Sequence, residues 1–171
     1  MGSSGSSDLD RLRGLVDDAL RGPVDALIAE DGDLARFAEA LRYPIGAGGK
    51  RLRPVLLLAV VEALDGDLAA GLAPACALEL VHTFSLVHDD LPALDDDDLR
   101  RGLPTTHVAY GEDIAILVGD GLLALAFRVI AEGRLLDGET RLALVRELSR
   151  ATDGMVRGQY LDLHPGAEPD E

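Results

Sequence analysis

The most informative stretch of the chain covers residues 79–102, which read ELVHTFSLVHDDLPALDDDDLRRG. Its first half is apolar at helical spacing and ends on two aspartates, and its second half is an acidic run closed by two arginines. Pro92 lacks a backbone donor and clashes with the preceding turn, so a helix that reaches it must end or distort there. The stretch therefore predicts a helix whose last turn presents carboxylates at the edge of a core.

Helical spacing recurs along the rest of the chain, and no sustained alternation bounded by hairpin signals indicates strands. We therefore predict an all-α fold. Segments 54–64 and 114–130 are apolar on nearly every side, which is expected of helices in the middle of a bundle. The expected helices cover residues 8–21, 33–42, 54–65, 73–90, 111–132 and 138–162.

Length and composition predict one domain. The chain has 171 residues, of which 47% are hydrophobic, and this is enough to bury one substantial core. Residues 1–7, MGSSGSS, have the composition of an expression-tag remnant. Residues 8–162 are expected to form the domain, and residues 163–171 have the proline, glycine and acidic content of a loop or tail.

Charge and apolar patterning exclude several classes of partner. The net charge of -15 would repel a phosphate backbone, so no nucleic-acid partner is expected. The uninterrupted apolar runs fall short of the roughly 18 to 20 residues that cross a bilayer, so no membrane span is expected. Cys76 is the single cysteine, and a lone cysteine fits a reducing compartment. We therefore expect a cytoplasmic protein.

The acidic run predicts a metal site. Residues 88–102 contain six carboxylates, and a solvated loop is the alternative explanation. Hard oxygen ligands without cysteine favour Mg²⁺, with Mn²⁺ as a substitute, and Mg²⁺ takes one or two carboxylates plus waters and phosphates. A loop after the helix can bring Asp89 and Asp95 to one metal. The histidine directly before Asp89 also fits an HD-type metallohydrolase, which needs further histidine ligands; only His107 and His164 remain for that purpose.

A basic turn at residues 48–54, GGKRLRP, predicts an anion site. The two glycines allow close approach of backbone to an anion, and a helix expected to begin at Pro54 would direct its positive end there. Lys50 is the only lysine among sixteen basic residues, which indicates a specific contact. A chance basic turn before a helix is the alternative.

Two helical spacings add polar candidates. His82, Ser85 and Asp89 are three and four residues apart and share one face of a helix, although a lone histidine on an apolar helix is often a satisfied core residue. Gln159 and Asp162 are three apart on another helix, a spacing that is also common on solvent-facing surfaces.

Taken together, segments 49–54, 79–90 and 99–107 resemble the polyprenyl synthetase family of trans-isoprenyl diphosphate synthases, in order and in spacing. The resemblance implies an isoprenoid-synthase-like helical bundle around a central apolar cleft. It also implies a magnesium-dependent prenyltransferase that condenses isopentenyl diphosphate with an allylic diphosphate, dimethylallyl or geranyl. A homodimer is expected for the same reason.

The resemblance also implies roles for individual residues. Asp89 and Asp95 would hold Mg²⁺ against the allylic diphosphate, with Asp90 supporting them. The residues implied to bind diphosphates are Lys50, Arg53, His82 and Arg101 on the isopentenyl side and Arg100, Gln159 and Asp162 on the allylic side.

Product length in the family depends on bulk beneath the first aspartate-rich motif. Phe84, with its neighbour Ser85, lies five residues before Asp89, where bacterial farnesyl-type members carry an aromatic. We therefore expect farnesyl diphosphate as product, with geranylgeranyl or longer products as the alternative.

Full-length members carry a second aspartate-rich motif, which the residues after Asp162 do not supply. We therefore expect this chain to be an amino-terminal portion, truncated on its carboxyl side, that does not complete the metal cluster alone. A non-catalytic diphosphate-binding subunit is one rival. A class I terpene cyclase is another, and the turn with Lys50 and Arg53 counts against it.

Overall fold

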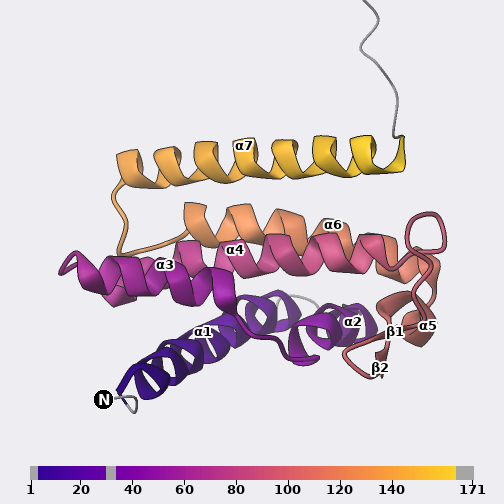
Figure 1. Cartoon of the computed structure of the whole chain (residues 1–171), viewed down its shortest axis with the longest axis horizontal. Coiled ribbons are helices and arrows are strands. Elements are labelled where there is room, and N and C mark those ends of the chain that lie inside the picture. Colours follow the sequence, from indigo (N-terminus) through magenta and orange to yellow (C-terminus); the bar gives the residue numbers. More distant parts are fainter. Residues whose placement is uncertain (1–3, 30–33, 165–171) are drawn as a thin grey trace, which may run out of the picture.

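A computed structural model describes residues 4–29 and 34–164 of the chain. Within them the protein is a bundle of helices with one small hairpin, which confirms the all-α prediction (Figure 1). The helices are α1 (Ser4–Ala29), α2 (Ala35–Gly46), α3 (Leu52–Ala63), α4 (Leu68–Asp89), α5 (Thr106–Tyr110), α6 (Glu112–Ala131) and α7 (Gly138–Leu163), and the strands are β1 (Leu99–Arg100) and β2 (Leu103–Pro104).

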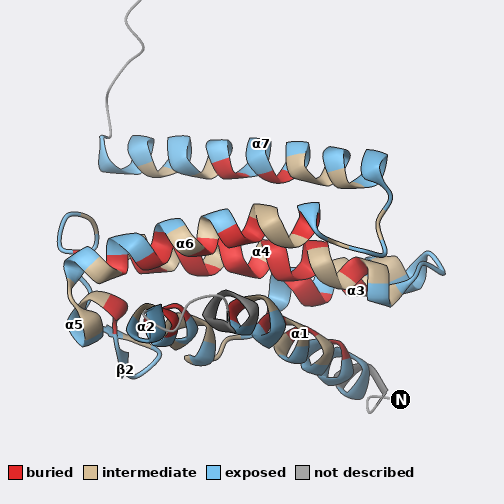
Figure 2. Ribbon diagram, turned by 180° about the vertical axis from the view of Figure 1, so that it is seen from behind, coloured by how far each residue is buried: buried red, intermediate tan, exposed pale blue. Residues whose placement is uncertain are grey.

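The centre of the bundle is α4, which packs against α1, α2, α3, α6 and α7. Figure 2 shows buried residues along most of its length. The prediction that 54–64 would be buried on nearly every side was wrong, because one stripe of α3 is exposed. The exposed stripe consists of Leu52, Leu56, Val60 and the C-cap residue Leu64. Residues spaced four apart lie on one face of a helix.

Helices α3 and α4 begin earlier than predicted. Helix α4 begins at Leu68 rather than 73, because the Asp67 side chain accepts a hydrogen bond from the Ala69 amide at 2.9 Å and caps the first turn. Helix α3 begins at Leu52, so Pro54 is its third residue. Proline is tolerated there because the first four amides of a helix have no partner within it.

The two ends of the chain differ from the predicted boundaries. Helix α1 continues through Pro23 to Ala29 instead of ending at 21, and it includes residues 4–7 of the expected tag remnant. Helix α7 reaches Leu163, one residue into the predicted tail. Residues 165–171 lie outside the described residues.

No strands were predicted from the sequence, yet β1 and β2 form a short antiparallel hairpin. Its two-residue turn consists of Arg101, with φ 55°, and Gly102, with φ 81°. Positive φ at both positions matches the right-handed twist of paired strands. The hairpin fixes the direction of two arginines directly after the acidic loop.

Two core helices bear on the expectation of no membrane span without deciding it. By length and composition, α4 and α6 are each apolar enough to cross a bilayer. Core helices of water-soluble bundles meet the same criteria, and 61% of the apolar window of α4 and 39% of that of α6 are buried within the protein.

The single cysteine should be chemically silent in the folded chain. Burial raises the pKa of the Cys76 thiol to about 12, so the nucleophilic thiolate is scarce at neutral pH. We expect Ellman's reagent to modify Cys76 rapidly in urea and at least about a hundredfold more slowly without it. Comparable rates in both conditions would contradict this placement.

Candidate functional site

The acidic loop folds back onto the end of α4. The Asp95 amide donates a hydrogen bond to the Asp89 carbonyl oxygen at 2.8 Å, and the Asp97 amide donates to the Asp90 carbonyl oxygen at 3.2 Å. These bonds close the turn that follows Pro92. The structure therefore brings the backbones of Asp89 and Asp95 together although the helix has ended between them.

The Asp89 carboxylate lies in a partly buried, negatively charged environment. The pKa of Asp89 is raised above its ordinary value, first by burial and then by the negative charge of Asp95. Within residues 4–29 and 34–164, neither carboxylate has a hydrogen-bond or ion-pair partner. Because no cationic side chain of the described residues contacts Asp89 or Asp95, this pair of carboxylates suits a divalent cation.

The composition of this pair suits Mg²⁺, which binds one or two carboxylates and keeps waters or phosphates as its other ligands. In the described part of the chain no three His, Cys, Asp or Glu residues come close enough to hold a metal together. With two carboxylates as protein ligands, waters or phosphate oxygens would complete the coordination of such an ion. This donor set does not fit a closed structural metal site, and it gives no support to the HD-type metallohydrolase.

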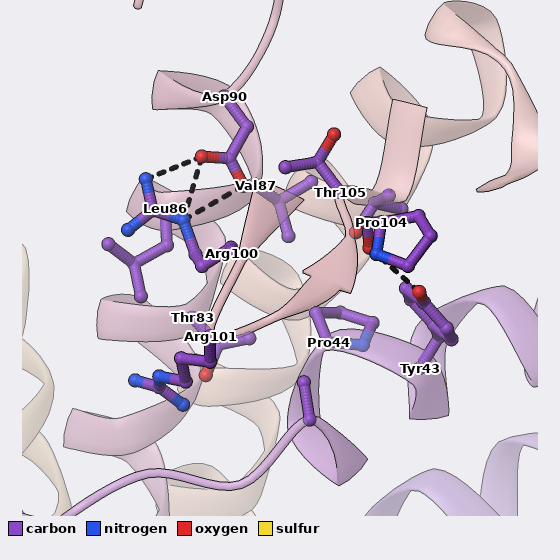
Figure 3. A pocket seen from close by; sticks show the side chains of 12 residues that line it. Tyr43, Pro44, Thr83, Leu86, Val87, Asp90, Arg100, Arg101, Pro104 and Thr105 are labelled. Atoms are coloured by element: carbon purple, nitrogen blue, oxygen red, sulfur yellow. Dashed lines mark hydrogen bonds and ion pairs between the residues drawn. The ribbon is translucent and has the colours of Figure 1, made fainter. Parts of the chain in front are cut away.

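Asp90 has a different environment from Asp89. Its side chain is buried, and Arg100 Nε donates to its two carboxylate oxygens at 2.7 and 3.0 Å (Figure 3). The two residues line a small cavity of about 30 Å³ beside Thr105. Arg100 thus reaches from β1 to the end of α4 and ties the hairpin to the acidic loop.

A second cluster contains the four residues implied to bind isopentenyl diphosphate. Lys50, Arg53, His82 and Arg101 line one cavity of about 430 Å³. They come from the turn before α3, from α3, from α4 and from the hairpin turn. Residues far apart in the sequence therefore converge on one concave, cationic surface.

Close packing and charge shape this cavity. A Cβ atom on Gly49 would lie 2.7 Å from Arg101 Nη1, so glycine lets the arginine lie against the backbone. The pKa of His82 is lowered from its ordinary value, first by burial and then by the positive charge of Arg53. At neutral pH His82 is therefore uncharged and offers one N–H donor.

Sequence reasoning missed two residues of this cavity, Arg51 and Glu79, which form a buried ion pair between Arg51 Nη1 and Glu79 Oε1 at 2.7 Å. Glu79 stands in the apolar helix that was predicted to end at the edge of a core. A buried carboxylate requires a partner, and this was the signal available in the sequence.

Four other predicted residues lie outside the cationic cavity. Phe84 is buried and meets the His88 ring edge-on, with centroids 5.0 Å apart. The Ser85 hydroxyl donates to the carbonyl oxygen of the preceding turn. The described residues lining the cationic cavity do not include Gln159 or Asp162, although the end of α7 lies toward the same end of the long axis as the loop after α4 (Figure 1).

His88 fixes the end of α4 against α6. Its Nε2 lies 3.1 Å from the Ile116 carbonyl oxygen. The ring occupies the space over Gly119, where an added Cβ atom would overlap it. Because Asp89 follows His88 directly, this contact also sets the position of the acidic pair.

Replacing Gly119 by alanine should therefore expel the His88 ring. We expect a loss of about 1–3 kcal/mol in the free energy of unfolding, measured in urea, which is typical of overpacking. Gly154→Ala is the matched control, because a Cβ atom there meets nothing within 4 Å. Equal stability of the two variants would contradict the close contact.

Comparison with known proteins identifies the family. The polyprenyl synthetase profile matches residues 35–171, most of the chain. The chain belongs to the polyprenyl synthetase family. This agrees with the resemblance of the three sequence segments described above.

The polyprenyl synthetase relatives differ in product. The chain is 51% identical over 133 residues to farnesyl diphosphate synthase of Geobacillus stearothermophilus, with 75% of this chain and 45% of that protein covered. It is 54% identical over 130 residues to geranylgeranyl pyrophosphate synthase 3 of Arabidopsis thaliana, and this match covers 73% of the present chain and 36% of that protein. The chain thus spans less than half the length of these curated relatives.

Solved structures of the family share the fold. The geranyltransferase of Legionella pneumophila superposes with a TM-score of 0.88 at 38% identity, and the match covers 97% of this chain and 59% of that one. An FPP/GFPP synthase of Zymomonas mobilis superposes with a TM-score of 0.78 at 39% identity, and the match covers 95% of this chain and 62% of that one. These neighbours confirm the isoprenoid-synthase type of helical bundle.

Proposed function

We propose that this polyprenyl synthetase chain forms part of a magnesium-dependent prenyltransferase site that joins isopentenyl diphosphate to an allylic diphosphate. The observation that carries the proposal is the convergence of Lys50, Arg53, His82 and Arg101 on one cavity. Three cations and a neutral histidine donor suit a small phosphorylated anion, whereas the chain as a whole is strongly acidic. A terpene cyclase has no need for this second anion site.

The two clusters take different substrates in this proposal. The cationic cavity holds the diphosphate of isopentenyl diphosphate. Asp89 and Asp95 hold Mg²⁺, or Mn²⁺ in its place, and the ion supplies positive charge to the departing allylic diphosphate. Arg100 contributes to the same side, and its bonds to Asp90 keep the acidic loop in place.

The chemistry proposed is ionisation, condensation and elimination, which needs no nucleophilic side chain. The arginines and the lysine fix the isopentenyl diphosphate so that its double bond faces the allylic carbon, and proximity of this kind lowers the barrier. Preorganised positive charge stabilises charge that develops on the leaving group. A proton is then lost from the condensed product.

A condensation assay tests the proposal. The full chain is incubated with Mg²⁺, radiolabelled isopentenyl diphosphate and geranyl diphosphate, with an EDTA control. Formation of an extracted, labelled prenyl product that EDTA abolishes supports the synthase. Binding of isopentenyl diphosphate by calorimetry without product supports a non-catalytic diphosphate-binding subunit, and neither binding nor product overturns both.

We propose farnesyl diphosphate as the product, because Phe84 lies one turn before His88 and packs edge-on against it. Phe84→Ala removes this bulk and should shift the products toward geranylgeranyl diphosphate, as read by mass spectrometry of dephosphorylated prenols. Phe127→Ala, on α6, is the control for loss of an aromatic elsewhere in the core. An unchanged product distribution would refute the assignment of Phe84.

Two further proposals concern the setting of the protein. We propose a homodimer, on the basis of the family, and light scattering of the purified chain measures it. A cytoplasmic location stays a prediction from the lone, buried Cys76, and cell fractionation tests it.

A further inference from the structure

One guanidinium holds the turn that carries the cavity's cations. Arg51 is buried, with a left-handed φ of 48°, and stands directly before the first residue of α3. Its Nε donates to Asp17 Oδ1 at 2.9 Å, its Nη1 to Glu79 Oε1 at 2.7 Å, and its Nη2 to the Ile45 carbonyl oxygen at 2.7 Å. The side chain therefore ties the turn to α1, α2 and α4 at once.

Glu79, the partner of Arg51 on α4, adds a negative charge to the lining of the cationic cavity. Glu79 lines the same cavity as Lys50 and Arg53, and its buried carboxylate would repel an anion there. Burial alone would lower the pKa of Arg51, but its hydrogen bonds to Asp17 and Glu79 outweigh this effect and raise it. The guanidinium stays charged and offsets the charge of Glu79.

We infer that Arg51 is a positioning residue of the anion cavity: it neutralises Glu79 and holds the turn with Lys50 and Arg53, while its own hydrogen bonds go to the protein. The inference rests on the proposed function, because it assumes that the cavity binds a diphosphate. These three contacts require the planar guanidinium group of arginine, whose nitrogens donate in three fixed directions. A lysine ammonium group does not provide this geometry.

Inorganic pyrophosphate is the probe, measured by calorimetry on the full chain in EDTA so that no divalent metal contributes. Arg51→Met leaves the charge of Glu79 uncompensated, and we expect the Kd to rise about tenfold or more. Adding Glu79→Gln in the same chain should restore the Kd to within about threefold of wild type. A residue that only stabilised the fold would show no such rescue.

Arg42→Met is the matched control. Arg42 also binds a carboxylate, Asp25, at 2.6 Å, and its loss changes the net charge equally, yet it does not line the cationic cavity. Its Kd should stay within about threefold of wild type. Circular dichroism establishes that each variant is folded.

The outcomes separate the two proposals. If the wild-type chain does not bind pyrophosphate, the proposed function fails and the inference fails with it. If the wild type binds and folded Arg51→Met binds equally, or the double variant shows no rescue, the inference alone is overturned. If Arg51→Met does not fold, Glu79→Gln decides: binding equal to or tighter than wild type supports the inference, and clearly weaker binding overturns it.

Discussion

In the magnesium-dependent condensation proposed above, the Asp89→Asn variant should lose at least about a hundredfold in activity, equivalent to about 2.7 kcal/mol of transition-state stabilisation. Asparagine keeps the shape of the side chain but removes the charge that attracts a divalent ion. Its partner Asp95 would then hold the proposed ion alone. The measurements are labelled-isopentenyl incorporation and, independently of turnover, Mn²⁺ binding by electron paramagnetic resonance in the presence of pyrophosphate.

Asp96→Asn is the matched control for this variant. Asp96 lies in the same acidic run, is exposed and has a φ of 54°, a conformation that asparagine adopts readily. We expect its activity and Mn²⁺ affinity to stay within about twofold of wild type. If the two variants lost equally, the acidic run would act by total charge, and the assignment of a metal to Asp89 and Asp95 would be wrong.

Leu122→Ala should lower the free energy of unfolding by about 2–5 kcal/mol. Leu122 is fully buried on α6, the helix that packs most extensively against α4. Truncation removes apolar contacts and leaves a cavity that close-packed neighbours fill only in part. For a chain of this size the midpoint of thermal unfolding should fall by about 2–4 °C for each kcal/mol lost.

Leu117→Ala provides the comparison within the same helix. Its side chain is 52% exposed, so its truncation removes little buried surface. We expect a change within about 0.5 kcal/mol by urea denaturation. Losses of similar size for both leucines would show that α6 is not oriented in the bundle as the structure has it.

The sequence predicted the helices best where signals were local. All four boundaries of α6 and α7 agree with expectation to within a residue, and Gly111 and Asp137 mark the beginnings of these helices. Proline misled the prediction at Pro54, where the helix was expected to begin. Pro54 lies inside α3, whose first turn begins earlier, at Leu52.

The cationic cavity was likewise predictable in its local features and not in its tertiary contacts. The chemistry of Lys50, Arg53, His82 and Arg101 was readable from residue types and family resemblance. Their convergence on one surface depends on how α3, α4 and the hairpin turn pack. Pairing between residues such as Arg51 and Glu79, separated by 28 positions, leaves no local pattern.

The apolar segment that ends at Asp89 and Asp90, with the acidic run after it, was enough to determine an all-α fold and the kind of ligand chemistry. These follow from periodicity and from residue types, which are local properties of the chain. Only the tertiary structure decided that Asp90 is buried against Arg100 while Asp89 lies beside Asp95. The physical reason is that burial and charge pairing depend on which elements meet in space, and neighbouring aspartates on a helix end face different neighbours.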